Sequence, residues 1–499
     1  MNVATSPRAA HRSAGNKPRA AAMTTPRRDR LAVFAVVIGA SVVAAVSARP
    51  WVGSWNDGSR LATVESLVDR HTFAIDDSIF SRPSDTPPEA STDAHPAPRL
   101  VTQDKLLIGG RYYSDKPPVP ALLMAGFYQL WRWGGGTTAR ERPDRFCYWS
   151  TLASSGLAYV VAVACVFLIG QSLLMSLAGR LALTASFAFA TLALPYARHV
   201  NAHVVLLGIA AALFLQLVRQ GRGAPTLTRR LVGLGTLAGL GYSVDLAAGP
   251  LLLVATLALV AYRCRRPGAL VVCALAALPW VGLHHALNYA IGGTIAPANT
   301  VPEYLLWPGS PFTRATMTGV WPHDGVRHFL GYALALLFGP RGFLDHNLPL
   351  WLALIGAVML TRQRPGEMPE VVGGAAWCIA TWLAYGLAST NYSGECASIR
   401  WFVPLLVPGY LVLAVVLRER PDLWPYLLIL SGWGTVLAAR MWWNGPWVRS
   451  LGGLFWPVQL AALASCVAWY AFRRRRLGDR GAPQSSRDGR APARLASPG

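Results

Sequence analysis

The feature that most constrains this chain is a series of long apolar runs, separated by short loops that are rich in arginine. A helix needs about 20 mainly apolar residues to cross the hydrocarbon core of a bilayer. Only 14% of the 499 residues are charged, whereas a soluble domain carries about 25%. The pattern excludes a soluble globule and predicts an all-α, polytopic membrane protein.

Twelve of the apolar runs are predicted to cross the membrane. The first run, 31–48, follows the basic segment 27–30, so its start is expected in the cytoplasm. Residues 46–48 also resemble the cleavage site of a signal peptide, and the sequence leaves open whether this helix is cleaved. The other predicted spans are 149–170, 181–196, 203–218, 231–243, 246–262, 269–287, 347–361, 371–388, 401–417, 421–440 and 451–472.

The positive-inside rule decides whether the marginal apolar segment 117–133 also crosses. If this segment lies in the interface, the arginine clusters of the short loops all face the cytoplasm. If it crosses, every cluster except the first moves outside, so the interfacial model is preferred. The same model makes the run 328–338 re-entrant or interfacial, because about ten residues are too few to span.

This topology places both termini in the cytoplasm of a multi-pass protein of the plasma (inner) membrane. It predicts a disordered basic tail at 1–30, a transmembrane domain at 31–472 and a second disordered basic tail at 473–499. The first extracytoplasmic loop, 49–148, is expected to carry interfacial helices. The net charge of +22 comes mainly from tails and loops, so it indicates topology and not nucleic-acid binding.

The polar motifs of the chain fall on the predicted extracytoplasmic side. A transporter is expected to carry ionisable groups near mid-membrane and to show repeated halves, whereas the sequence shows no internal repeat and almost no charge within the spans. An enzyme is therefore favoured. A transporter or flippase of a lipid-linked envelope precursor is the alternative, and a non-catalytic scaffold of an envelope complex is a third.

Asp57 follows the first span and precedes an amphipathic segment with Leu61, Val64 and Leu67 on one face. A carboxylate at the membrane surface can deprotonate an acceptor hydroxyl or bind a cation. The structural alternative is that Asp57 or Ser59 caps the amphipathic helix. The residues alone leave both roles open.

Two cations are candidates for holding a phosphate. Lys116 is one of only three lysines, and the proline after it fixes the start of a helix and so orients the charges in front of it. Its compact ammonium suits a phosphate, although a snorkelling side chain at the interface is the alternative. Arg400 lies at the lip of a span, and its planar fork suits bidentate phosphate contact.

Three further residues carry weaker signals. His199 and His203 are four apart and could share one face of a helix, which is compatible with a metal, although two ligands are few and hydrogen bonding at the interface is the alternative. Asp245 lies between two apolar half-spans, where a turn or cap residue is expected.

The order of these motifs resembles that of the GT-C glycosyltransferases, and among them the protein O-mannosyltransferases, the lipid A aminoarabinose transferases and the bacterial RgtA/B/C/D-like group. The resemblance covers about residues 31–220 and rests on Asp57 after the first span, on Tyr113-x-Asp115-Lys116-Pro117-Pro118, and on Tyr196-Ala197-Arg198. Relatives carry Asp or Glu where this chain has His203, a departure that bears on metal dependence and acceptor type. Because no large soluble C-terminal domain is expected, the oligosaccharyltransferases are disfavoured.

The resemblance implies transfer of one sugar, with inversion, from a polyprenyl-phosphate sugar to a hydroxyl of a lipid, glycan or protein at the extracytoplasmic face. Lys116 and Arg400 would stabilise the leaving phosphate, and Asp57 would be the catalytic base. Weaker substrate-binding candidates are Arg60, Tyr113, Asp115, His199, His203 and Asp245. The resemblance gives no certain cofactor and leaves a divalent cation open.

Overall fold

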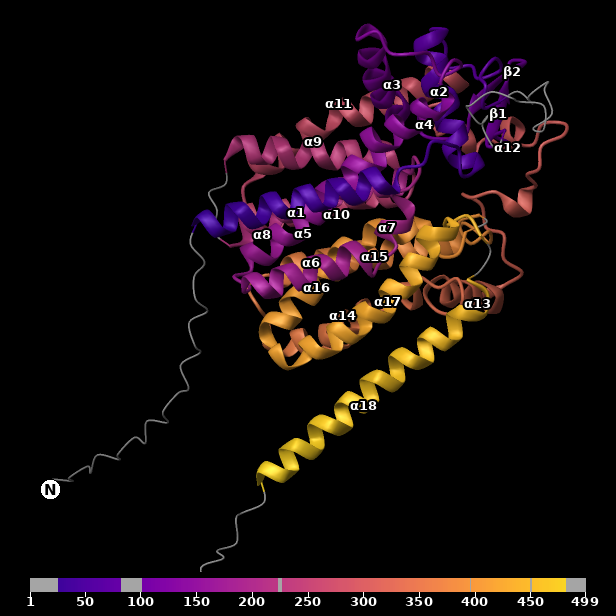
Figure 1. Cartoon of the computed structure of the whole chain (residues 1–499). Coiled ribbons are helices and arrows are strands. Elements are labelled where there is room, and N and C mark those ends of the chain that lie inside the picture. Colours follow the sequence, from indigo (N-terminus) through magenta and orange to yellow (C-terminus); the bar gives the residue numbers. More distant parts are fainter. Residues whose placement is uncertain (1–25, 82–100, 223–226, 395, 449–450, 482–499) are drawn as a thin grey trace, which may run out of the picture.

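The computed structural model describes residues 26–81, 101–222, 227–394, 396–448 and 451–481. Long helices run side by side through most of this part of the chain, and short helices with a β-hairpin gather at one end of them, which we call the loop end (Figure 1). The start of α1 (Pro26–Ser47) and the end of α18 (Phe455–Gly481) lie at the opposite end.

A helix is present at each of the twelve predicted spans. Besides α1 and α18, these are α5 (Leu157–Ser172), α6 (Leu177–Phe189), α8 (Ala202–Gly221), α9 (Thr228–Val244), α10 (Ala248–Cys264), α11 (Pro267–Gly292), α14 (Leu350–Gln363), α15 (Met368–Leu387), α16 (Leu406–Glu419) and α17 (Trp424–Asn444). Within the described residues, seven helical stretches are long and apolar enough to cross a bilayer. The chain is therefore a multi-pass membrane protein, and the count of twelve crossings stays a prediction.

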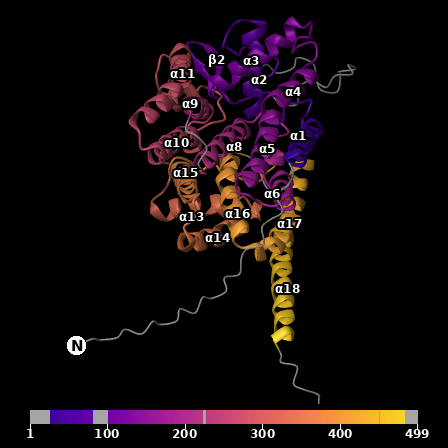
Figure 2. The same ribbon diagram turned by 90° about the vertical axis from the view of Figure 1, so that its left-hand side faces the viewer.

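Helices α8 and α16 are the most deeply buried of these long apolar helices. Figure 2 shows α9, α10 and α11 on one side of them and α1, α5 and α6 on the other. Helices α9 and α11 approach closely because Gly235 and Gly239 are one turn apart, and a side chain at either would overlap the backbone of Cys273 or Ala277. Small residues four apart are a common means of close helix packing in membranes.

The loop end is built from α2 (Trp55–Asp69), the strands β1 (Lys105–Ile108) and β2 (Arg111–Ser114), α3 (Pro118–Trp133) and α4 (Pro143–Thr151). Helix α3 begins directly after Pro117, as the proline pair predicts. Leu61 and Val64 on α2 share one apolar cluster with Met124 and Tyr128 on α3. This cluster holds the two helices together at the loop end.

The β-hairpin is missing from the sequence prediction of an all-α chain. Its strands pair antiparallel, with Lys105 opposite Ser114. Gly109 and Gly110 form the turn with φ angles of 58° and 78°, the positive values that a two-residue type I′ turn requires. A Gly-Gly pair between two short strand-like runs is the sequence signal that indicates such a hairpin.

Several predicted boundaries are wrong. Residues 26–30 are helical in α1, and residues 473–481 continue α18, because arginine is a good helix former. The span expected from 149 starts earlier, since α4 continues through a π-helical turn at Leu152–Gly156 into α5. The run 181–196 is divided into α6 and the short α7 (Ala193–Tyr196). The rest of the two predicted tails lies outside the described residues.

The remaining described elements are short. They are α12 (Pro302–Leu305), α13 (Val326–Leu337) and single helical turns at Ala298–Thr300, Arg314–Thr316, Leu344–His346, Arg400–Leu405, Pro421–Leu423 and Gly452–Leu454. Helix α13 covers most of the run 328–338 that was expected not to cross. Its 12 residues span about 18 Å at the α-helical rise, which is shorter than the hydrocarbon core.

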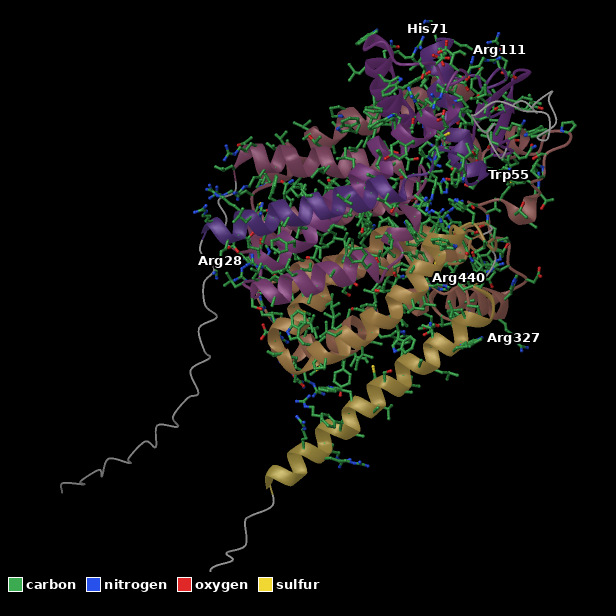
Figure 3. All side chains as sticks on the ribbon, viewed as in Figure 1. Arg28, Trp55, His71, Arg111, Arg327 and Arg440 are labelled. Carbon is green, nitrogen blue, oxygen red and sulfur yellow. The ribbon has the colours of Figure 1, made fainter. Side chains whose placement is uncertain are left out.

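The arginines that the positive-inside rule assigned to one side do gather at one end. Arg222 and Arg418 both pair with Glu367, and Arg263 pairs with Glu370, at the end opposite the loop end. Arg28 lies at the same end (Figure 3). These pairs link the ends of neighbouring helices there and leave the loop end with a different set of polar contacts.

Candidate functional site

Helix α2 presents two different faces to its surroundings, because residues three and four apart lie on one side of a helix. Its polar face carries Asn56, Ser59, Arg60 and Thr63. Asp57 lies instead in line with Leu61 and Val64, on the face that packs into the apolar cluster. The two faces place Asp57 and Arg60 in different surroundings.

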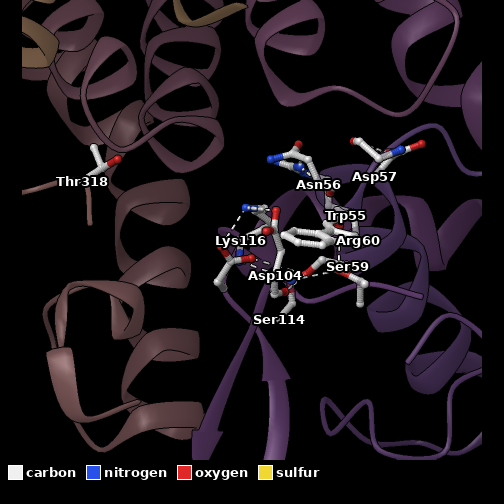
Figure 4. A network of polar contacts seen from close by, with 12 residues as sticks. Trp55, Asn56, Asp57, Ser59, Arg60, Asp104, Ser114, Lys116 and Thr318 are labelled. Carbon is white, nitrogen blue, oxygen red and sulfur yellow. Dashed lines mark hydrogen bonds and ion pairs between the residues drawn. The ribbon is translucent and has the colours of Figure 1, made fainter. Parts of the chain in front are cut away.

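Lys116 is the centre of the polar network beside α2. Its Nζ lies 2.7 Å from Oδ2 of Asp115 and 2.7 Å from Oδ2 of Asp104. Ser59 Oγ donates to the backbone oxygen of Asp104 (2.6 Å) and lies 2.6 Å from Ser114 Oγ. Figure 4 shows this network, with Asp57 apart from it.

Asp104 was missed by the sequence prediction. The β-hairpin brings it to the site, because Lys105 pairs with Ser114, so that the residues flanking this pair, Asp104 and Asp115, meet at the same end of the hairpin. Burial raises the pKa of Asp115, and the neighbouring Lys116 opposes this rise. Lys116 is therefore a cation already shared by two carboxylates.

Arg60 is a buried guanidinium with no carboxylate at ion-pair distance in the described part of the chain, although the charges of Asp115, Asp104 and Asp57 lie near enough to oppose the lowering of its pKa by burial. It is 4% exposed and donates to both the backbone oxygen and the Oδ1 of Asn56, while its Nε has no partner. Burial lowers its pKa to about 10, so it stays charged near neutral pH. Arg60 and Lys116 line a small pocket together with Thr63, Phe73, Tyr113, Ser114, Pro117, Pro118, Ala121 and Ile291.

Arg400, in the helical turn before α16, lies near the same region. Its guanidinium lies 5.3 Å from the centre of the Trp447 ring, and its Nε is buried without a partner. Burial is the main cause of the lowered pKa of Arg60, and the positive charge of Arg400 is the second. The fold therefore brings two of the predicted site cations, more than 300 residues apart in sequence, into electrostatic contact.

Asp57 takes a capping role at the start of α2. Ser54, and not Asp57 or Ser59, is the N-cap residue. Both oxygens of Asp57 accept hydrogen bonds: Oδ1 from Ser54 N and Ser54 Oγ (2.7 and 2.5 Å), and Oδ2 from Gly53 N (2.7 Å). The carboxylate is 1% exposed, and burial raises its pKa to about 6.

His199 is the neighbour of Asp57 across the loop end. Its Nδ1 lies 3.5 Å from Asp57 Oδ2, and its ring packs on Gly53, where a Cβ would come within 2.6 Å of Nε2. Burial, followed by the charge of Arg198, lowers the pKa of His199 to about 3. The imidazole is neutral near pH 7, so the contact with Asp57 is not an ion pair.

His203 and Asp245 form a second imidazole–carboxylate pair. His203 Nδ1 lies 2.9 Å from Asp245 Oδ2, and the Tyr385 hydroxyl donates to Asp245 Oδ1 (2.9 Å). Asp245 also accepts from the backbone of Ala247 and Ala248, which is the cap role expected from sequence. The carboxylate partner of His203 thus comes from the junction between α9 and α10.

The expectation that His199 and His203 share a helix face is wrong. Helix α8 begins at Ala202, because Asn201 caps it, so His199 precedes the helix. The two imidazoles contact different carboxylates. Within the described ranges, no group of three or more His, Cys, Asp or Glu side chains is placed to hold a metal ion.

No family model and no curated protein sequence matches the chain. Among solved structures, it is similar to ArnT from Cupriavidus metallidurans bound to undecaprenyl phosphate, with a TM-score of 0.50, 12% identity, and coverage of 89% of this chain and 77% of that one. It is also similar to an oligosaccharyltransferase from Archaeoglobus fulgidus, with a TM-score of 0.44, 12% identity, and coverage of 87% and 56%. The likeness to ArnT confirms the fold that the resemblance implied.

Proposed function

We propose that this chain, which has the fold of the GT-C membrane glycosyltransferases, transfers a sugar from a polyprenyl-phosphate donor to an acceptor hydroxyl at its loop end. The observation that carries the proposal is the pocket lined by Arg60 and Lys116, with Arg400 close by. Guanidinium groups with buried, unpaired N–H donors and no carboxylate at ion-pair distance call for an anionic ligand. The undecaprenyl phosphate bound by ArnT supports a lipid phosphate as that ligand.

The three cations have different roles in the proposed donor site. Arg60 and Arg400 hold the phosphate, because neither has a carboxylate at ion-pair distance among the described residues, and a guanidinium fork can bind phosphate in a bidentate manner. Lys116 is fixed between Asp104 and Asp115. Lys116 offers the phosphate an ammonium group, which is held in place because the hairpin brings Asp104 and Asp115 together around it.

The proposed reaction is a single displacement. The acceptor oxygen attacks the anomeric carbon, the bond from that carbon to the phosphate oxygen breaks, and its electron pair remains on the phosphate. The cations stabilise the charge that grows there. The hydroxyl proton passes to Asp57, whose pKa of about 6 leaves it ionised at neutral pH and close to the optimum for a general base. Capping is the competing role of this carboxylate.

The distribution of ion pairs supports an enzyme over a transporter or flippase. In the part of the chain that the structure describes, the ion pairs lie at the loop end or at the opposite end. A transport pathway is expected to carry ionisable groups near mid-membrane. The described ion pairs instead lie at the two ends of the bundle, and the contacts of Lys116 and His203 with carboxylates lie at the candidate site.

Donor consumption tests the proposed function directly. Membranes that contain the chain are expected to consume one member of a panel of undecaprenyl-phosphate hexoses and pentoses, with release of undecaprenyl phosphate. Membranes with the Asp57→Ala variant serve as the control. If no member of the panel is consumed above this control, the proposed reaction is wrong.

The pH dependence of transfer is expected to follow Asp57. A general base acts in its ionised form, so the rate should rise with pH up to about 6 and level off above it. Stability should change in the opposite direction: because the folded pKa exceeds the usual value of 3.8, the contribution of Asp57 to stability falls as pH rises from about 4 to 6. Rates and thermal unfolding of wild type and Asp57→Asn across this window measure both effects, and a rate limb that persists in Asp57→Asn would exclude Asp57 as its source.

A further inference from the structure

Two arginines flank one tryptophan ring beside the Asp57–His199 pair. The guanidinium of Arg49 lies 5.0 Å and that of Arg198 lies 5.8 Å from the ring centre of Trp442. The indole is fixed in place, because its Nε1 donates to Ser47 Oγ (2.8 Å). The backbone N–H of Arg49 donates to the oxygen of Arg198 (3.1 Å), which holds the two arginines side by side.

Neither arginine has a carboxylate at ion-pair distance among the residues that the structure describes, in contrast to Arg222 or Arg263 at the opposite end. Arg198 is 5% exposed, and the Nε atoms of both Arg49 and Arg198 are buried without a partner. Buried donors that lack an acceptor cost free energy. Burial lowers the pKa of Arg198 to about 10, and the nearby charge of Arg49 acts in the same direction.

The pair formed by Arg49 and Arg198 lies near Asp57, the proposed base for the acceptor, and not in the donor pocket. Arg198 directly precedes His199, which contacts Asp57. Arg60 lies on the other face of α2, where it lines the donor pocket together with Lys116. Arg49 follows the loop-end terminus of α1. A ligand on the arginine pair would therefore lie beside Asp57 and apart from the donor pocket.

We propose that Arg49 and Arg198 bind a phosphate group, and that this phosphate belongs to the acceptor, whose hydroxyl is thereby held near Asp57. The second part rests on the glycosyltransferase function proposed above. Two guanidinium groups supply paired N–H donors that match the oxygens of a phosphate. A head group of an ordinary membrane lipid offers the same chemistry, so the test separates the two sources.

Protection from phenylglyoxal, which modifies guanidinium groups, tests the proposal residue by residue. The full chain is purified in a neutral detergent and modified in inorganic phosphate or in chloride at equal ionic strength, and each arginine is quantified by peptide mass spectrometry. Arg49, the more exposed of the pair, should be protected by phosphate. Arg440, exposed on the same helix as Trp442 and at the same end (Figure 3), should not.

Variants test whether the two arginines act together. In Arg198→Gln, the phosphate concentration that half-protects Arg49 should rise about tenfold or more, as expected for the loss of a charge-assisted contact. Arg440→Gln should leave it unchanged. Arg198→Lys covers the case in which Arg198→Gln fails to fold, since it keeps a cation at the site.

Equal protection of Arg49 and Arg440 by phosphate would overturn the site. If micelles that contain phosphatidylglycerol protect Arg49 without added phosphate, membrane lipid occupies the site and the acceptor assignment is wrong. If inorganic phosphate protects and phosphatidylglycerol does not, the acceptor assignment is supported. Protection is measured without any sugar transfer. Its result therefore does not depend on the outcome of the donor-consumption experiment.

Discussion

The Asp57→Asn variant is expected to transfer sugar about 10²-fold more slowly than the wild type or worse, because an amide cannot take the proton of the acceptor hydroxyl. The substitution also removes one hydrogen bond. The amide oxygen of the variant can still accept from Ser54, but the amide nitrogen would then face the Gly53 N–H that Asp57 Oδ2 now accepts. A stability loss of about 1 kcal/mol should therefore accompany the loss of rate.

Ser54→Ala is the matched control for this experiment. It deletes the hydroxyl that donates to Asp57 Oδ1 but keeps the carboxylate, so it should cost about 1 kcal/mol as the loss of an N-cap side chain does. Transfer rates at a temperature where all the proteins are folded, together with thermal unfolding, compare the two variants. The general-base role predicts a slow Asp57→Asn enzyme and a nearly normal Ser54→Ala enzyme.

The capping role predicts a different outcome. If Asp57 only stabilises the start of α2, both variants should lose similar stability and retain similar activity. A fully active Asp57→Asn enzyme would defeat the general-base assignment. It would leave the burial of Asp57 and its contact with His199 as parts of the packing between α2 and the segment that precedes α8.

The Lys116→Met variant is expected to raise the KM for the donor about tenfold or more, since a charge-assisted hydrogen bond contributes roughly 1.5–3 kcal/mol. It should also lower stability, because Asp104 and Asp115 would face each other without the ammonium that now lies 2.7 Å from each. Two carboxylates at such a site cannot both stay ionised at low cost. Donor KM, kcat and thermal unfolding are the measurements.

Two variants separate the effect on donor binding from the effect on stability. Lys116→Arg keeps the positive charge between the carboxylates, so its stability should recover. Arg400→Ala removes a cation that has no carboxylate partner among the described residues. It should weaken the donor interaction without exposing an acidic pair. Unchanged donor KM and kcat in Lys116→Met and Arg400→Ala would remove both residues from the proposed phosphate site.

The multi-pass, helical character of this protein follows from the sequence alone. Apolar runs of helical length form helices wherever they occur, because a backbone in lipid must satisfy its own hydrogen bonds. The arginine clusters of the loops indicated which loops share a side, and the structure places Arg222, Arg263 and Arg418 at one end. The start of α3 could also be predicted from nearby residues, since proline is favourable in the first turn of a helix and α3 begins at Pro118.

The composition of the site was decided by the tertiary structure. Asp104 meets Lys116 only because the hairpin pairs Lys105 with Ser114, and His203 meets Asp245 only because the ends of α8 and α9 converge. These contacts depend on turn conformations and helix packing, which act between residues far apart in the chain.

Tertiary structure also decides that Asp57 and Lys116 lie in different surroundings. Both were assigned to one site from their order in the chain, but the 3.6-residue period of α2 directs Asp57 to the apolar face and Arg60 to the pocket. Arg400, more than 300 residues later in the sequence, comes close to Arg60 through the packing of the bundle. Sequence order thus identified Asp57, Arg60, Lys116 and Arg400 but not Asp104, and the tertiary structure determined which of these groups act on one another.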